Sequence, residues 1–152
     1  MRFNCISFAT PPDVLKAVSI IKIYKLFVPT WTFNTYWLKQ PHNIKLISLC
    51  YPIINNNNTS TNISIPIGSG ILFDEPSPLY PNIGVFVKPP HRRFGAGTSI
   101  IQSIILNSNS SPTNPIKKFK AFSGIPGSYQ FYKKLLIPCS SPAPLTNTSH
   151  HY

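Results

Sequence analysis

The clearest pattern of apolar and polar positions lies near the start of the chain and predicts a helix over residues 11–27. Thr10 precedes two prolines, which suit a first helical turn because its N–H groups have no intrahelical partner. Asp13 can reach back to the cap and meet the helix dipole, and Pro29 stops the helix. Polar residues in this stretch recur at every third position, so the apolar face drifts around the helix.

Shorter apolar runs further along the chain favour strands. Residues 30–38 alternate aromatic and polar side chains, which predicts a strand with one apolar face, and residues 44–54 form a second candidate strand. Residues 98–106 carry isoleucines at helical spacing, although isoleucine favours strands, so both assignments stay open. Three further β-leaning pieces, the last of them the best formed, are residues 63–67, 71–73 and 83–87.

Composition divides the chain into six stretches, none of which is a confident domain. They are an apolar N-terminal segment with the helix (1–54), an asparagine-rich linker (55–62), short β-leaning segments (63–106), a polar linker (107–115), a basic-aromatic segment (116–137) and a Pro/Ser-rich tail (138–152). The 17 prolines interrupt helices and central strands. The expected fold class is therefore an irregular α+β chain, with one N-terminal helix, a few short strands and extensive Pro/Asn/Ser-rich coil, partly disordered.

The composition also bears on whether the chain has a selected activity. Residues whose codons begin with G are scarce, with five Val, five Ala, seven Gly, two Asp and one Glu, whereas there are 20 Ile and 17 Pro. A bias in the bases of one DNA strand explains this pattern more simply than selection on a fold. The sequence therefore predicts a basic, proline-rich, low-complexity product of a dubious or poorly constrained open reading frame, with no assignable activity.

Charge, cysteines and hydropathy exclude few classes of function. The net charge of +11 comes from a shortage of acid, since three Asp and Glu face 14 Lys and Arg. Cys5, Cys50 and Cys139 are odd in number and far apart, so they suggest neither a disulfide framework nor a zinc site. A run of about 18 apolar residues, which a membrane span needs, is absent, so no transmembrane span is expected. The compartment stays unassigned.

One glycine-containing segment, residues 91–99, has the residue types of an anion-binding turn. Arg92 and Arg93 precede a Gly-x-Gly turn, and Ser99 lies near a helix start. Guanidinium groups and backbone N–H groups in such a turn can bind a phosphate. The segment lacks the Lys-Ser/Thr ending of a P-loop and the third glycine of a dinucleotide fingerprint. An exposed turn is therefore the default interpretation.

Lysines interleaved with aromatic rings suggest a surface for polyanions. Rings can stack on unpaired bases while lysines neutralise phosphates, so RNA or another polyanion is the alternative function. An anionic membrane surface suits the same pattern, which gives a peripheral membrane protein as the second alternative. A solvated face or a disordered basic segment explains it equally well. The candidate polyanion-binding residues are Arg92, Arg93, Lys117, Lys118, Phe119, Lys120, Phe122, Phe131, Tyr132, Lys133 and Lys134.

Residues suited to catalysis are few. Asp74 and Glu75 are adjacent and point in opposite directions in a strand. A thiol–imidazole pair of Cys50 with His42 or His91 is conceivable, but nothing in the sequence places them together. The sequence therefore predicts no enzyme, no catalytic residue, no cofactor and no metal site.

Overall fold

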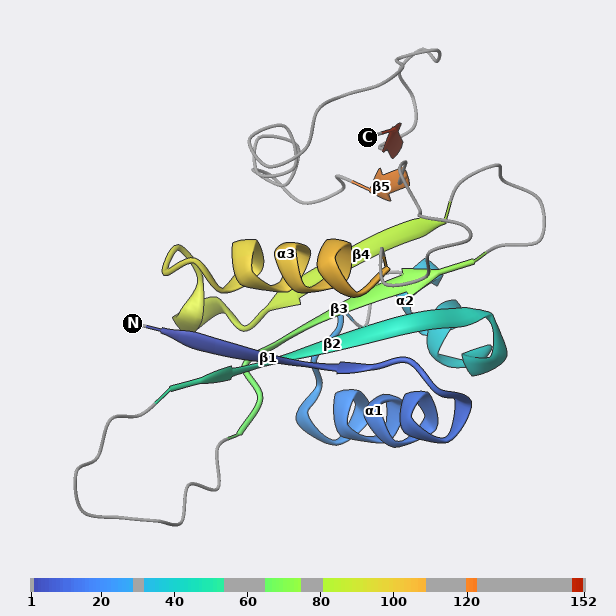
Figure 1. Ribbon diagram of the computed structural model, residues 1–152, viewed down its shortest axis with the longest axis horizontal. Helices are drawn as coiled ribbons and strands as arrows, with labels where there is room; N and C mark the ends of the chain where they lie inside the picture. The colour runs from blue at the N-terminus through green and yellow to red at the C-terminus, as the bar shows by residue number, and fades with distance from the viewer. Residues whose placement is uncertain are drawn as a thin grey trace.

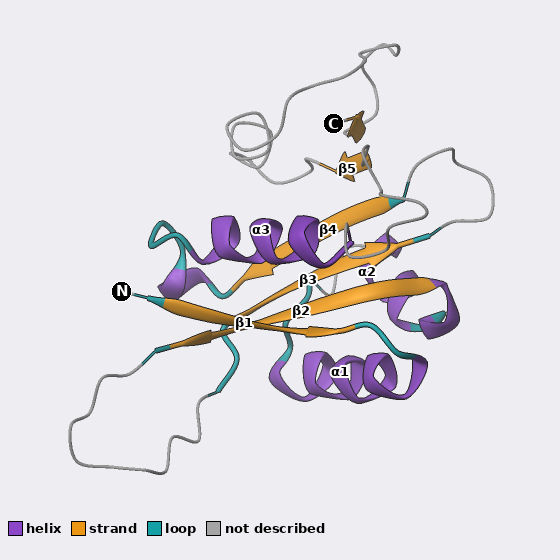
Figure 2. Cartoon of the chain, viewed as in Figure 1, coloured by secondary structure: helices purple, strands orange, loops and turns teal. Residues whose placement is uncertain are grey.

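Four antiparallel strands form the centre of the structure, a computed structural model that describes residues 2–28, 32–53, 65–74, 81–108, 120–122 and 149–151. They are β1 (Phe3–Phe8), β2 (Ile44–Pro52), β3 (Gly68–Phe73) and β4 (Asn82–Val87), and each pairs with the next. β5 (Lys120–Phe122) lies parallel to β4, and β6 (Ser149–His151) is antiparallel to β5. Helices α1 (Pro11–Tyr24) and α3 (Ala96–Ser108) cover opposite faces of the sheet (Figure 1 and Figure 2).

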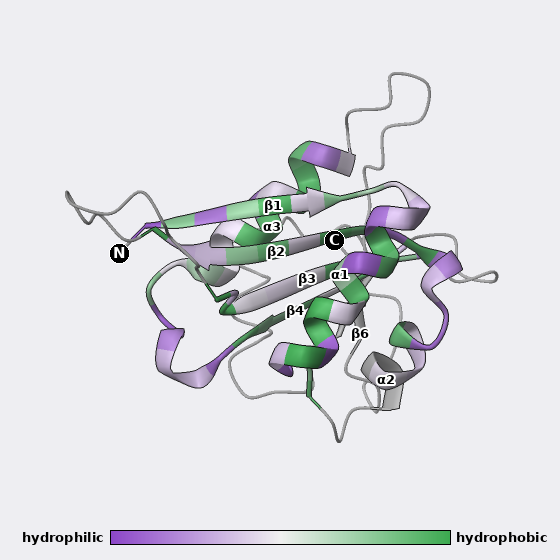
Figure 3. Ribbon diagram, turned by 90° about the horizontal axis from the view of Figure 1, so that it is seen from below, coloured by the Kyte–Doolittle hydropathy of each residue, from purple (hydrophilic) through white to green (hydrophobic). Residues whose placement is uncertain are grey.

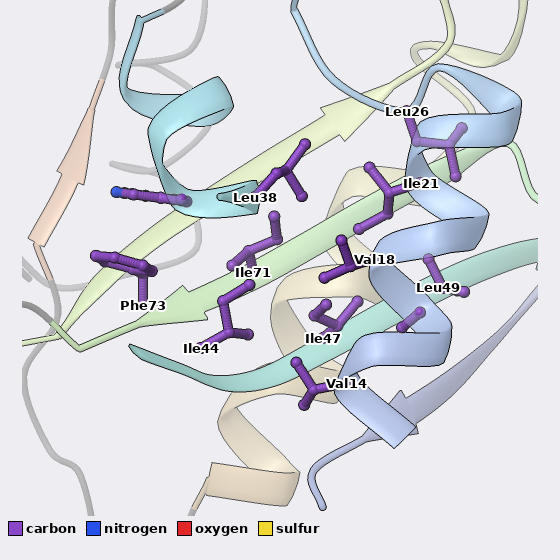
Figure 4. Packing of buried hydrophobic residues seen from close by; sticks show 12 residues of the cluster. Val14, Val18, Ile21, Leu26, Leu38, Ile44, Ile47, Leu49, Ile71 and Phe73 are labelled. Atoms are coloured by element: carbon purple, nitrogen blue, oxygen red, sulfur yellow. The ribbon is translucent and has the colours of Figure 1, made fainter. Parts of the chain in front are cut away.

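The face under α1 holds the larger of the two hydrophobic clusters. Val14, Val18 and Ile21 project from α1 onto Ile47 and Ile71 of the sheet (Figure 4). Figure 3 shows α1 lying across this face, with hydrophobic segments alternating with polar ones along the helix. The spacing of four and three residues brings these side chains to one side of α1. Each such buried side chain contributes about 1.5–3 kcal/mol of transfer free energy.

The face under α3 is packed closely because two strand positions are glycine. Ile100 and Ile104 of α3 are fully buried against the sheet. A Cβ atom on Gly70 would lie 2.6 Å from Ile104 Cδ1 and would also overlap Ile100. A Cβ atom on Gly68 would lie 2.9 Å from a backbone oxygen of β4. The glycines therefore let α3 approach the backbone of β3.

Helix α1 begins at Pro11 as expected and ends at Tyr24 rather than at residue 27. The end is set by Lys25, which adopts a left-handed conformation with φ 54°. The N–H of Leu26 then donates to the carbonyl of Ile21 at 2.9 Å, and the Leu26 side chain is buried. This hydrogen-bonded reversal with a buried apolar residue behind it terminates the helix before Pro29 can.

Thr10 precedes α1 without capping the helix through its side chain. The Thr10 carbonyl accepts the N–H of Val14 at 2.8 Å, but the exposed Thr10 side chain makes no capping hydrogen bond. We expect Thr10→Ala to lower the free energy of unfolding by less than about 0.5 kcal/mol, against about 1 kcal/mol for a working cap. Urea denaturation followed by circular dichroism measures the difference, and a loss of 1 kcal/mol or more contradicts it.

Residues 30–38 differ from the expected strand, because the structure has helix α2 (Thr32–Leu38) there. Trp37 is fully buried and stacks on Phe73 of β3, with ring centroids 5.0 Å apart and planes at 10°. Leu38 is buried beside it in the cluster under α1. The aromatic side chains therefore pack on the sheet from a helix, a tertiary contact that the local alternation does not report.

The expected irregular fold is wrong, because the described ranges form an ordered α+β fold with a packed sheet and two hydrophobic clusters. The prolines explain the error. α1 begins with proline, as do the short 3₁₀ helices η1 (Pro41–Asn43) and η2 (Pro89–His91), and Pro52 is the last residue of β2. Proline is tolerated at such boundaries because no internal N–H donor is lost there.

Several other predicted elements are found in the structure, but one strand was not predicted. The strand at residues 83–87 is confirmed by β4, and residues 44–54 contain β2. Residues 98–106 belong to α3, where Ile100, Ile101 and Ile104 are all buried. Strand β1, which forms the first edge of the sheet, was not predicted from the sequence.

Candidate functional site

The segment between β4 and α3 is the candidate site, and its backbone is tightly determined. The N–H of Lys88 donates to the carbonyl of Ile67 at 2.8 Å, which fixes the exit from β4. The N–H of Arg92 donates to Pro89 O at 3.2 Å and closes η2. Arg93 then has φ 71° and Gly95 has φ 92°, so the chain turns through two left-handed residues before α3 begins. A left-handed arginine is strained, and such strain is often found at functional sites.

The first turn of α3 presents N–H groups that the helix does not use. The first intrahelical bond is the one from Ser99 N–H to Gly95 O, at 3.0 Å. The N–H groups of Ala96, Gly97 and Thr98 therefore precede the hydrogen-bonded ladder of the helix. The first turn of α3 contains no acidic residue. Its unsatisfied N–H groups and the helix dipole together favour an anion.

The cations of this segment add to that preference. Lys88, Arg92 and Arg93 lie between β4 and α3, and residues 81–108 include neither Asp nor Glu. Arg92 Nε donates to Val87 O at 2.8 Å, and its guanidinium carbon lies 5.8 Å from the ring centroid of Phe86. These contacts hold the guanidinium at the end of β4, where it meets no competing carboxylate from its own segment. The segment is therefore cationic as well as rich in backbone donors.

Strand β4 has a main-chain edge that its described neighbours leave open. β3 pairs with all six residues of β4, but β5 pairs only with Asn82 and Ile83. Within the ranges that the structure describes, no strand pairs with residues 84–87 on the β5 side, and these four residues are half-buried. The N–H and C=O groups of such an edge can hydrogen-bond an extended ligand as if it were a further strand.

Space for a ligand is present at the turn itself. Gly95 is exposed, and a Cβ atom built on it meets no atom within 4 Å. An anion can therefore approach the backbone at this position. The open edge of β4 leads directly along the chain into this turn, so an elongated ligand with an anionic end fits the two features together.

Of the predicted polyanion residues, Arg92 and Arg93 lie in this segment, both exposed. Lys120 and Phe122 lie in β5, where only the backbone is described. The structure therefore does not test whether the predicted residues form one surface. The others lie outside the described residues: Lys117, Lys118, Phe119, Phe131, Tyr132, Lys133 and Lys134.

The other candidates from the sequence do not assemble into a catalytic group. Asp74 lies 3.6 Å from the ammonium of Lys45 in an exposed ion pair, and Glu75 lies outside the described residues. Cys50 is buried, and its partner in the strand register is Cys5. In the described part of the chain, no three His, Cys, Asp or Glu side chains cluster as metal ligands, and no helix has the length and hydrophobicity of a membrane span.

The sequence indicates the turn between β4 and α3 but not the strand edge beside it. The Gly-x-Gly segment follows an apolar strand and leads into an isoleucine-rich helix. That order of elements is the feature of the sequence that could have identified the site. The open edge of β4 could not be foreseen, because strand neighbours are a property of the folded sheet.

Comparison with known proteins gives a fold but no relative in sequence. No protein-family model and no curated protein matches the chain. Among solved structures, it is similar to a protein assigned as an N-acetyltransferase from Lactobacillus plantarum, with a TM-score of 0.59 and 11% identity over 99% of this chain and 97% of that one. It is also similar to yncA, assigned as an acetyltransferase, from Salmonella typhimurium with its cofactor acetyl-CoA, at TM-score 0.56 and 13% identity over 100% and 94%. A ribosomal-protein-alanine N-acetyltransferase from Brucella melitensis gives 0.51 and 11% over 99% and 97%.

These similarities overturn several expectations. The sequence predicted a product with no assignable activity, from a dubious reading frame, and no enzyme. Both expectations are wrong, because the three solved structures above that share this fold are described as acetyltransferases. The described ranges are ordered, contrary to the expected low-complexity and partly disordered chain. Neither the RNA alternative nor the membrane alternative gains support. The chain has the fold of the GNAT acetyltransferases.

Proposed function

We propose that this protein is an acetyltransferase that binds acetyl-CoA along β4 and at the start of α3, and passes the acetyl group to an amine. The observation that carries the proposal is the combination of an open strand edge with the cationic, glycine-containing turn that follows it. The first feature suits an extended arm, and the second suits an anionic end. Acetyl-CoA has both, since its amide-containing arm is attached to a diphosphate.

The diphosphate fits the first turn of α3. Its oxygens can accept hydrogen bonds from the N–H groups of Ala96, Gly97 and Thr98, which the helix leaves free. The absence of a side chain at Gly95 gives the anion access to the backbone. Arg92 and Arg93 supply positive charge. A hydrogen bond from a guanidinium to a phosphate oxygen is charge-assisted, and such bonds are about twice as strong as neutral ones.

The arm fits the edge of β4. Its amide groups can exchange hydrogen bonds with main-chain groups of residues 84–87, which no described strand uses on that side, apart from Val87 O, which accepts a hydrogen bond from Arg92 Nε. This pairing aligns the arm with the strand and brings its thioester end toward the start of β4. The bound thioester supplies an acetyl group activated for attack by an amine nitrogen. The role of the described residues is to bind and orient that donor.

Acetyl-CoA binding to the full chain, measured by isothermal titration calorimetry, tests the proposal. We expect saturable binding that coenzyme A competes for and that weakens as salt rises, because the diphosphate contacts are charge-assisted. Arg92→Ala is expected to weaken the affinity about tenfold. This corresponds to the loss of about 1.4 kcal/mol, the contribution of one hydrogen bond between the guanidinium and the diphosphate. Transfer is then followed by mass spectrometry, with the acetyl group appearing on members of a panel of primary amines.

A matched control separates the site from general charge. Lys22→Ala removes one exposed positive charge from α1, which covers the opposite face of the sheet. This variant is expected to keep its affinity within about twofold, because its exposed charge makes no contact with the proposed ligand and is screened by salt. Absence of binding at low salt, or equal losses in Arg92→Ala and Lys22→Ala, contradicts the proposed site.

A further inference from the structure

Two cysteines lie opposite each other on neighbouring strands. Cys5 of β1 is the register partner of Cys50 of β2. Opposed residues in an antiparallel ladder alternate between hydrogen-bonded and non-hydrogen-bonded pairs. The N–H of Ile53 donates to Arg2 O at 2.9 Å, so the pair Arg2 and Ile53 is hydrogen-bonded. Alternation along the ladder then makes Cys5 and Cys50 a non-hydrogen-bonded pair.

That position brings the two thiols within bonding range. Opposed Cα atoms in a non-hydrogen-bonded pair are about 4.5 Å apart, and disulfides span Cα separations of about 4.4–6.8 Å. Both side chains belong to the cluster under α3. A disulfide can therefore form here without a change of strand register.

The two thiols differ in exposure and in acidity. Cys5 is half-buried, whereas Cys50 is fully buried. The hydrogen bond from the Cys50 thiol lowers the pKa of Cys5, although burial opposes this. The same hydrogen bond, together with burial, raises the pKa of Cys50. Cys5 is therefore the thiol that ionises first and can be reached from solvent, and Cys50 is the partner held behind it.

We propose that Cys5 and Cys50 form a modification site, an oxidisable dithiol that closes to a disulfide by exchange with a low-molecular-weight disulfide. The Cys5 thiolate attacks one sulfur of the small disulfide, and the first small thiol leaves as a mixed disulfide forms on Cys5. The Cys50 thiol then attacks Cys5 Sγ, loses its proton, and releases the second small thiol. The protein loses two electrons and two protons, and the small disulfide gains them. The site depends on strand register and not on acetyl transfer.

The test uses the full chain with Cys139→Ser, so that the third cysteine cannot form an adduct of its own. Cys139 lies outside the described residues. The native protein is incubated with oxidised glutathione and examined by intact mass. We expect the loss of two hydrogen masses with no retained glutathione, together with a rise in Tm of roughly 5–10 °C from the new link between β1 and β2.

Two further variants assign the roles of the cysteines. Cys50→Ala in the same background is expected to keep one glutathione on Cys5, because the resolving thiol is missing. Cys5→Ala is expected to react at least about tenfold more slowly, because the remaining thiol, Cys50, is fully buried, which blocks access to it and disfavours its thiolate. A persistent glutathione adduct on the Cys139→Ser protein overturns the proposal. So does a native protein that keeps both thiols free under conditions in which the same chain, unfolded in urea, is oxidised. Equal reactivity of the two variants, each shown by circular dichroism to be folded, also overturns it.

Discussion

Thr98→Asp is expected to weaken acetyl-CoA binding at least about 30-fold while leaving the protein as stable as before or slightly more stable. Thr98 is half-buried in the first turn of α3. A carboxylate there faces the anion that the proposal places at the same N–H groups. Two like charges 4 Å apart repel by about 4 kcal/mol at an effective dielectric constant of about 20. Half of that value, which allows for solvent at a partly exposed position, corresponds to about 30-fold in affinity.

The opposite effect on stability is what makes this variant informative. A carboxylate in the first helical turn meets the positive end of the dipole and contributes about 0.3–1 kcal/mol to the folded state. Thr98→Asn is the control, because it has nearly the same shape as Asp without the charge. Calorimetry measures affinity, and urea denaturation measures the free energy of unfolding. Unchanged affinity in a stable Thr98→Asp protein means that no anion binds at this helix start.

Gly70→Val is expected to lower the free energy of unfolding by about 3 kcal/mol or more. The β-carbon alone would overlap Ile100 and lie 2.6 Å from Ile104 Cδ1, and both side chains are fully buried. Neither isoleucine can move into solvent, so α3 has to shift away from β3. Overpacking of a well-filled core costs about 1–3 kcal/mol, and a displaced helix loses further contacts with the sheet.

A double-mutant cycle distinguishes this overlap from a general effect of valine. Ile100→Ala is destabilising alone, because it leaves a cavity under α3, at a cost of about 2–5 kcal/mol. In the double variant, the valine side chain occupies part of that cavity, so the combined loss is expected to be at least about 0.5 kcal/mol smaller than the sum of the single losses. Additive losses contradict the proposed contact. Gly95→Ala is a reference, because its Cβ meets no atom and only the positive φ is penalised, by about 1 kcal/mol.

The misjudged composition has a clear structural counterpart. Isoleucine abundance suggested base bias, yet Ile21, Ile47, Ile83 and Ile104 are each fully buried in one of the two clusters. Composition counts residues without their positions, and a biased composition can still be arranged to fill a core. Cores tolerate such bias because total volume and pattern matter more than the identity of each apolar residue.

The amino-acid sequence by itself determined the local features whose causes lie within a few residues. These include the start of α1 at its two prolines, the strand at residues 83–87, and the turn that joins Arg92 and Arg93 to a Gly-x-Gly segment. Helix starts, strands and turns of this kind depend on proline geometry, side-chain branching and the φ values open to glycine.

Tertiary structure alone decided the rest, because it depends on contacts between residues far apart in the chain. Packing on Phe73 gives Trp37 its place in the core from a helix, where the local alternation favoured a strand. The order of strands leaves an edge of β4 open beside the turn, and that juxtaposition converts an ordinary cationic loop into a candidate site. Strand register likewise places Cys5 opposite Cys50. No local pattern encodes which strands become neighbours, since pairing is selected by the burial of whole faces.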